Sequence, residues 1–346
     1  MSEPLGVLVS ASGAPGTARL LRALRENGER EVRLVGTDKS ALAIGRHLCD
    51  AFHVVPAGSE ATFADAMLEV CRHEGVSVVL PQSSFDLLGL AEAKERFADD
   101  GVRVMVSSPE AIRRSNDKAS SYAMFDEIGV PGPAWRRVRG VEAVAESAGE
   151  LGYPDEDVCM KPVFSSGTRG FRVLSASADR REQLLTNRPG VAEALRLEDL
   201  VELLGPDDDT ELLVMELATG TERTIDGIAD GGSVALGHAK TREAMRAGLA
   251  MYFKTLDDPW LEDVAERIVA ELHLDHFFNI QLVGERVIEV NPRISTIVYQ
   301  DDLNLPWLGV KHALGELSGA DLGVLRARVR PGRRALRYFD QIEWDE

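Results

Sequence analysis

The sequence predicts an α/β protein that begins with a parallel sheet and continues as a mixed α+β region. In the first hundred residues, short apolar runs alternate with amphipathic stretches, as in a parallel sheet covered by helices. Beyond Ser107-Ser108-Pro109 this alternation ends, and strands follow one another across short turns. The chain has 346 residues, of which 44% are hydrophobic, which is enough for domains of about 100–200 residues each.

The N-terminal elements follow from the spacing of the apolar residues. Buried runs predict strands at 6–10, 33–37, 76–81 and 102–106. Amphipathic stretches predict helices at 17–26, 63–74 and 87–97. The loop at 10–16 joins the first strand to the first helix, where backbone N–H groups can meet an anion.

The sequence leaves two interpretations of this loop open. Gly13 and Gly16, with the acidic Asp38 further on, are compatible with a NAD-dependent oxidoreductase, although the GxGxxG pattern is incomplete. The other interpretation is a tight turn between strand and helix that binds nothing.

The second part of the chain is expected to open with helices at 109–114 and 116–127, which the Gly- and Pro-rich run at 129–133 ends. Further strands are expected at 158–162, 171–174, 212–216, 224–229, 233–237, 278–282 and 287–290, and through the basic stretch 326–334. Further helices are expected at 180–183, 197–203, 263–272 and 311–317.

Net charge limits the partners. The 39 Lys and Arg residues stand against 57 Asp and Glu, a balance of −18. Such a chain is expected to be repelled by nucleic acid and by anionic membranes, whereas a small anionic ligand fits a local basic pocket. The N-terminus has no basic signal region, and no apolar run approaches the roughly 20 residues of a membrane span. We therefore expect a cytoplasmic protein.

The most specific feature is a predicted hairpin near residue 285. Its first strand carries Gln281, and its second carries Glu289 and Asn291, followed by Arg293. Because side chains alternate at period two, Glu289 and Asn291 share one face, with Gln281 opposite. An oxygen-rich cluster of this kind suits Mg²⁺.

Two further features carry chemistry. Lys161 ends a predicted strand and precedes a Ser- and Gly-rich loop at 165–170, a pattern that suits phosphate binding or merely a loose hairpin. The apolar strand ending at Glu216 runs into Gly220-Thr221-Glu222, which offers backbone groups to a base and a carboxylate to a sugar. This last feature alone is uninformative.

The order of these features resembles the ATP-grasp superfamily. The residues that carry the resemblance are Asp117-Lys118, Met160-Lys161 with its loop, Met215-Glu216 with Glu222, Asn279-x-Gln281, and Glu289-x-Asn291-Pro292-Arg293. The chain looks most like the carboxylate–amine ligases related to the large chain of carbamoyl phosphate synthase, over about residues 5–318. The resemblance implies a Rossmann-like pre-ATP-grasp domain at 1–108, and two ATP-grasp lobes at 109–212 and 213–346.

The resemblance also implies a role for each matching residue. The ATP phosphates would contact Lys118, Lys161 and a lid containing Ser165, Ser166, Gly167 and Gly170. Adenine would meet the backbone at Glu216, Leu217 and Ala218, and the ribose would meet Glu222. Mg²⁺, with Mn²⁺ as an alternative, would lie on Gln281, Glu289 and Asn291. Arg293, Lys161 and Arg242 would act in catalysis.

The implied activity is ADP-forming ligation of a small carboxylic acid, such as an amino acid, to an amine through an acyl phosphate. The expected partners are these small molecules, and the resemblance allows a homodimer. The alternatives are an ATP-binding sensor or scaffold that does not turn over, and the NAD enzyme above.

One departure affects the substrate rather than the ATP chemistry. Relatives usually follow Asn-Pro-Arg with a Ser-Gly pair, whereas this chain has Ser295-Thr296. In the stretch 299–302 beyond it, Asp301 or Asp302 either attracts an amine or caps a helix, and the sequence leaves both interpretations open.

Overall fold

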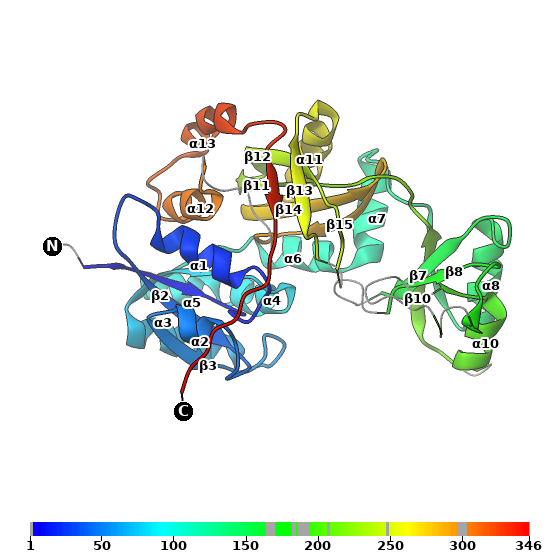
Figure 1. Ribbon diagram of the computed structural model, residues 1–346, viewed down its shortest axis with the longest axis horizontal. Coiled ribbons are helices and arrows are strands. Elements are labelled where there is room, and N and C mark those ends of the chain that lie inside the picture. Colours follow the sequence, from blue (N-terminus) through cyan, green and yellow to red (C-terminus); the bar gives the residue numbers. More distant parts are fainter. Residues whose placement is uncertain are drawn as a thin grey trace.

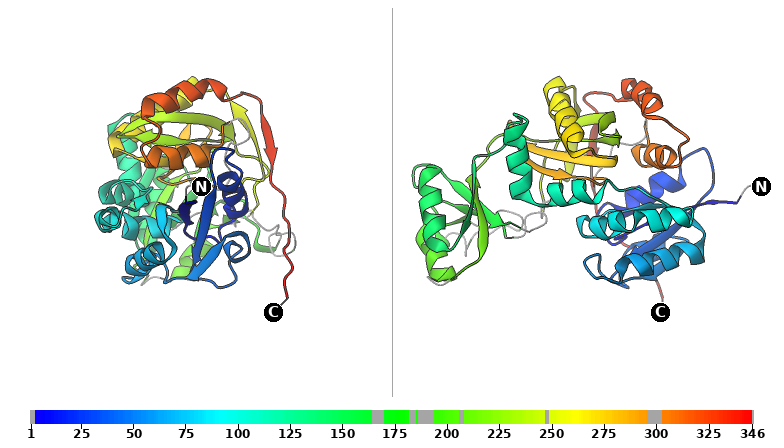
Figure 2. Two further views of the ribbon diagram at one scale, coloured as in Figure 1. Left: turned by 90° about the vertical axis from the view of Figure 1, so that its left-hand side faces the viewer. Right: turned by 180° about the vertical axis from the view of Figure 1, so that it is seen from behind.

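The structure is a computed structural model that describes residues 3–163, 170–181, 185, 194–205, 208–246, 249–295 and 303–345. Three sheets follow one another along the longest axis, with the N-terminal sheet at one end, the largest sheet in the middle and the smallest sheet at the other end (Figure 1). The view from behind in Figure 2 shows the same separation.

The predicted N-terminal parallel sheet is confirmed. Its strand order is β3 (Ala51–Val54), β2 (Val32–Asp38), β1 (Leu5–Val9), β4 (Val76–Leu80) and β5 (Arg103–Val104). The helices are α1 (Thr17–Arg25), α2 (Gly45–Leu48), α3 (Phe63–Glu74), α4 (Ser84–Glu92) and α5 (Lys94–Asp99). The sequence missed α2 and β3, which have four residues each. The helix expected at 87–97 is two helices that meet at Ala93.

The small sheet has the order β6 (Trp135–Arg139), β10 (Glu211–Glu216), β7 (Val158–Pro162), β8 (Arg172–Leu174) and β9 (Ala194–Leu195). Helices α8 (Val141–Glu150) and α10 (Leu197–Leu204) pack their apolar residues on it. The helix expected at 180–183 extends outside the described residues.

The large sheet has the order β15 (Arg286–Asn291), β14 (His276–Val283), β11 (Glu222–Asp230), β12 (Ser233–Thr241), β13 (Tyr252–Leu256) and β16 (Arg334–Leu336). One face is apolar and shares a core with α6 (Pro109–Asn116), α7 (Lys118–Glu127) and α11 (Pro259–Leu272). The opposite face carries the polar residues described below.

Two expectations for the C-terminal part are wrong. The helix expected at 311–317 is α12 (Leu305–Ala313), which begins earlier because the Asn304 side chain accepts a hydrogen bond from Trp307 N. The basic stretch 326–334 was expected to be one strand. It instead begins with a 3₁₀ turn at Arg326–Arg328, directly after α13 (Gly319–Leu325), and it reaches a strand only at β16.

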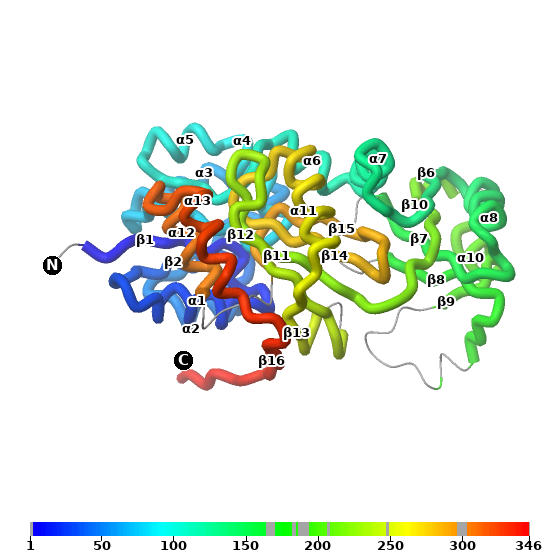
Figure 3. Tube along the Cα trace, turned by 90° about the horizontal axis from the view of Figure 1, so that it is seen from above, coloured from blue at the N-terminus to red at the C-terminus, as the bar shows by residue number. Residues whose placement is uncertain are grey.

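The N-terminal domain and the large sheet share one apolar core. Leu80 of β4 and Leu20 of α1 belong to the same buried cluster as Phe277 of β14 and Trp307 of α12. The C-terminal segment leaves β16 and runs back along the N-terminal domain (Figure 3), where Trp344 lies 4.3 Å from the His47 ring. Within the described residues, no helix is long and apolar enough to cross a membrane.

Candidate functional site

The large sheet gathers its polar side chains on one face through strand register. Glu289 and Asn291 of β15 lie opposite Gln281 and Asn279 of β14. The same row continues onto β11, where Asp226 lies opposite Asn279 and Thr224 lies opposite Gln281. On β12, His238 then lies opposite Asp226, and Lys240 lies opposite Thr224. The predicted hairpin and its shared face are thus confirmed.

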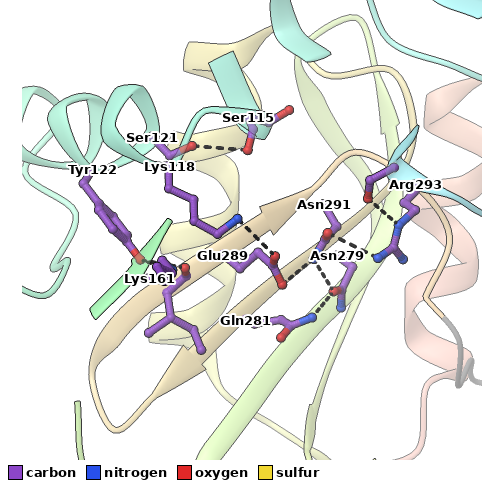
Figure 4. Close-up of polar contacts among 12 residues, drawn as sticks. Ser115, Lys118, Ser121, Tyr122, Lys161, Asn279, Gln281, Glu289, Asn291 and Arg293 are labelled. Carbon is purple, nitrogen blue, oxygen red and sulfur yellow. Dashed lines mark hydrogen bonds and ion pairs between the residues drawn. The ribbon is translucent and has the colours of Figure 1, made fainter. Parts of the chain in front are cut away.

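Asn279 lies at the centre of a hydrogen-bonded set of amides on this face (Figure 4). Its Nδ2 donates to Asp226 Oδ1 at 2.5 Å, and its Oδ1 accepts from Gln281 at 2.9 Å and from Asn291 at 3.3 Å. Asn291 Nδ2 also reaches Glu289 Oε2 at 3.2 Å. The cluster therefore offers the Glu289 carboxylate and side-chain amide oxygens, next to the buried carboxylate of Asp226, a donor set that suits a hard cation such as Mg²⁺. In the described ranges, no group of three or more His, Cys, Asp or Glu residues forms a separate metal site.

Two lysines face Glu289 from other elements. Asp117 caps α7 by accepting from Ser120 N, which makes Lys118 the first residue of the helix. Lys118 Nζ lies 4.0 Å from Glu289 Oε1. Lys161, on β7 of the small sheet, lies near the same carboxylate (Figure 4). Two ammonium groups beside one carboxylate favour an anionic ligand.

Tyr122 fixes the position of Lys161. Its hydroxyl accepts from Lys161 Nζ at 3.1 Å and donates to the carbonyl of Ile288, next to Glu289, at 3.0 Å. Burial and the charge of Lys118 lower the pKa of Lys161 to about 8, although Glu289 opposes this shift. The lysine is therefore mostly protonated at neutral pH and close to losing its charge.

Arg293 lies just beyond β15 and is partly buried. Its Nη2 donates to Asn291 Oδ1 at 3.3 Å, its Nη1 to the carbonyl of Ile294 at 3.1 Å, and its Nε to Ser84 Oγ at 3.1 Å. Burial lowers its pKa, while the charges of Glu289 and Asp226 act in the opposite direction.

Arg242 follows β12 and joins two of the predicted site residues. Its Nη1 donates to Glu222 Oε1 and to Gln281 Oε1. Burial raises the pKa of Glu222, and the charge of Arg242 partly offsets this effect. The residues expected for ribose, metal and catalysis are thus in contact with one another.

The neighbouring strands β11 and β12 carry a fully buried charged pair. Lys240 Nζ forms an ion pair with Asp226 Oδ2, and both side chains have at most 1% of their surface exposed. His238 Nε2 lies 3.8 Å from the same carboxylate oxygen. Burial and the charge of Lys240 lower the pKa of His238 to about 4.

The remaining predicted residues lie around this face. The N–H of Glu216 donates to the carbonyl of Ala134 at 2.8 Å, so Leu217 and Ala218 are the better candidates for adenine contacts. Gly170 has φ +71°, and a Cβ there would lie 2.7 Å from Pro162 Cδ. Ser165, Ser166, Gly167, Thr296 and residues 299–302 lie outside the described residues.

Asp38 has a structural role in the N-terminal loop. Its Oδ2 accepts from Gly13 N at 2.8 Å and its Oδ1 from Ser40 N at 2.9 Å. These contacts favour the tight-turn interpretation over a ribose-binding acid.

Sequence reasoning missed Tyr122 and Ser84 and gave no role to Asn279. The alternation that places Gln281 also places Asn279 on the site face, so a signal for it was available. Tyr122 and Ser84 reach the site only through tertiary contacts.

Comparison with known proteins agrees with the fold. The family model described as ATP-grasp in the biosynthetic pathway with Ter operon matches residues 208–331, which hold most of the large sheet. The chain carries an ATP-grasp domain. A second model, the PylC-like N-terminal domain, matches residues 7–105 ahead of the ATP-grasp domain.

Individual proteins align with more of the chain than either family model does. The large chain of carbamoyl phosphate synthase from Methanothermobacter thermautotrophicus is 28% identical over 318 residues, covering 85% of this chain and 27% of its own length. This chain spans about a quarter of the length of the curated relatives it matches.

Solved structures share the fold of the ATP-grasp domain and its N-terminal partner. An L-amino acid ligase from Bacillus licheniformis has a TM-score of 0.66 at 13% identity and covers 96% of this chain and 79% of that one. The biotin carboxylase domain of 2-oxoglutarate carboxylase from Hydrogenobacter thermophilus, a dimer in complex with MgADP, ADP and bicarbonate, has a TM-score of 0.64 at 18% identity, with coverages of 96% and 74%.

Proposed function

We propose that this chain is an ATP-dependent carboxylate–amine ligase that activates a small acid as an acyl phosphate and releases ADP and phosphate. Amino acids are the first acids to test. The observation that carries the proposal is the convergence of Glu289, Asn291 and Arg293 on one face with Lys118 and Lys161 opposite Glu289.

The residues of this site fit a nucleoside triphosphate with a bound divalent metal ion. Lys118 and Lys161 would hold phosphate oxygens as point charges, and Tyr122 would keep Lys161 in place. Glu289 and Asn291, with Asn279 or Gln281, would hold Mg²⁺ or Mn²⁺, which neutralises the triphosphate and lowers the barrier to phosphoryl transfer. Leu217 and Ala218 would meet the base.

The reaction needs positioning and charge neutralisation rather than a protein nucleophile. A carboxylate oxygen of the acid attacks the γ-phosphorus, and ADP leaves. The neutral amine then attacks the carbonyl carbon of the acyl phosphate and phosphate leaves, while the new amide loses a proton. Arg293 would stabilise the charge on the transferred phosphoryl group through both steps.

The test is ADP and phosphate release that appears only when an acid and an amine are both present. Arg293→Ala is expected to lower turnover by about 10²- to 10³-fold or more, with ATP binding largely kept. Arg137→Ala, which breaks an exposed pair with Glu211 outside the site, is the matched control and should keep full activity. Release of AMP and pyrophosphate would rule out the acyl-phosphate route.

A second candidate is an ATP-binding sensor without turnover. It is favoured by the contacts of Arg242, whose guanidinium already donates hydrogen bonds to the side-chain oxygens of Gln281 and Glu222. Tight MgATP binding in calorimetry, without ADP formation across a broad panel of acids and amines, would favour the sensor.

A thermal shift with NAD but not with ATP would favour the NAD-dependent oxidoreductase.

A further inference from the structure

We propose that Ser84 is a positioning residue that orients Arg293, so that the N-terminal domain takes part in the chemistry of the ATP-grasp domain. The inference rests on the proposed function, because Arg293 acts there on the transferred phosphoryl group. It starts from one contact: Arg293 Nε donates to Ser84 Oγ at 3.1 Å, between residues 209 positions apart.

Arg293 needs such a contact because strand pairing does not hold it. β15 ends at Asn291, and the chain turns at once, with Arg293 N donating to the Asn291 carbonyl at 2.8 Å. Two of the hydrogen bonds from the guanidinium go to Asn291 and Ile294, within two residues of Arg293 itself. These partners move with the turn. Among the described residues, Ser84 supplies the hydrogen bond to this guanidinium from another domain.

The contact also determines which part of Arg293 meets a ligand. A guanidinium has five N–H groups, and the contacts to Ser84, Asn291 and Ile294 use three of them. In the contacts of the described residues, one N–H remains on each terminal nitrogen, and a pair of this kind can hold two oxygens of a phosphoryl group or a carboxylate. With Nε turned toward Ser84, an oxyanion meets the guanidinium at its end rather than along its side.

Ser84 itself is firmly placed. It is the first residue of α4, and the cap of that helix is the neighbouring Ser83, whose side chain accepts from Phe85 N. The hydroxyl of Ser84 is therefore free of capping and turned to Arg293. Asp86 in the first turn of α4 is held by Ser10 Oγ at 2.6 Å. The apolar core shared by β4, α1, α12 and β14 fixes this domain against the large sheet.

The experiment compares Ser84→Ala with a matched change in the same helix. Ser84→Ala removes the acceptor of Nε, leaves that N–H without its partner and frees the guanidinium to rotate, so kcat should fall about tenfold or more. The KM for ATP should stay within about twofold, because Lys118 and Lys161 are untouched. Ser84→Thr keeps the hydroxyl and should restore most of kcat. Ser83→Ala removes the helix cap without touching Arg293, so it should lower Tm but not kcat.

A double mutant separates orientation from a general structural effect. If Ser84 acts through Arg293, then adding Ser84→Ala to Arg293→Ala should cause no further loss of kcat. Equal losses in Ser83→Ala and Ser84→Ala, additive losses in the double mutant, or wild-type kcat in Ser84→Ala would each overturn the proposal.

A binding experiment decides the matter without turnover. MgADP with aluminium fluoride mimics the transferring phosphoryl group, and calorimetry gives its affinity relative to MgADP alone. Ser84→Ala should reduce this gain in affinity about tenfold and leave MgADP binding unchanged. Lack of ligase activity in the wild-type protein would count against the proposed function, whereas an unchanged gain would count against the role of Ser84.

Discussion

Arg242 Nη1 donates a hydrogen bond to the side-chain oxygen of Gln281 and also contacts Glu222 Oε1. The oxygen that the sequence assigns to a metal ion is therefore in contact with a cation of the protein. A guanidinium and Mg²⁺ repel each other and compete for the same lone pairs, so the two cannot share this oxygen without cost.

Arg242→Ala is expected to change the metal requirement and the rate in opposite directions. Loss of the competing cation should lower the half-saturating Mg²⁺ concentration by about three- to tenfold, which corresponds to about 1 kcal/mol. Loss of a charge beside the reacting groups should lower kcat by about 10²-fold. The measurement is ADP formation as a function of Mg²⁺ at saturating ATP. An unchanged Mg²⁺ requirement would mean that Gln281 is not a metal ligand.

Nucleotide binding should weaken as the pH rises through the pKa of Lys161. Burial and Lys118 lower this pKa to about 8 in the free protein. The ammonium form, which attracts phosphate, is therefore present below about pH 8 and lost above it. Calorimetry of MgADP binding at pH 7 and pH 9.5 should show about a tenfold weaker affinity at the higher pH. Lys161→Arg stays charged throughout and should bind with little dependence on pH; an equally steep profile in that variant would assign the effect to another group.

The sequence predicted the β14–β15 side of the site well because two-residue periodicity fixes which side chains share a face. Gln281, Glu289 and Asn291 needed only the hairpin turn to be recognised, and their register followed. The ion pair of Asp226 with Lys240 was not predicted; β12 continues to Thr241, beyond the strand predicted at 233–237.

Contacts between residues far apart in the chain left no local sequence pattern from which they could be predicted. Tyr122 meets Lys161 across 39 residues, and Ser84 meets Arg293 across 209. No spacing rule joins such positions, since they come together only when the small sheet and the N-terminal domain take their places around the large sheet. The sequence thus predicted the sheet face, and the structure added the residues that neighbouring domains bring to it.

Folding stability should fall in mild acid because of His238. Its pKa is lowered to about 4 by burial and by Lys240, with Asp226 acting in the opposite direction. Between this value and the ordinary histidine pKa of about 6.5, the unfolded chain binds more protons than the folded one, so acid favours unfolding. The stabilisation from neutral His238 is complete above about pH 6.5 and decreases by up to about 1.4 kcal/mol per pH unit below it.

Urea unfolding of wild type and His238→Gln between pH 7 and pH 5 measures this contribution. The variant should show a shallower loss of unfolding free energy over this range. His276, whose pKa burial lowers to about 3, contributes in the same direction and remains in both proteins. Identical slopes for the two proteins would exclude His238 as a source of the acid sensitivity.

Replacing only Asp226 in the buried Asp226–Lys240 pair should lower the free energy of unfolding strongly, whereas replacing both residues should lower it little. Asp226→Asn leaves the Lys240 ammonium buried without its counter-charge, and such a change costs about 3–5 kcal/mol of stability. Adding Lys240→Met removes the stranded charge with a side chain of similar length, and should recover most of that loss because the desolvation cost of both ions disappears. Chemical unfolding of the two single variants and the double variant gives the coupling energy directly. A double variant less stable than Asp226→Asn would show that Lys240 stabilises the fold through contacts other than this pair.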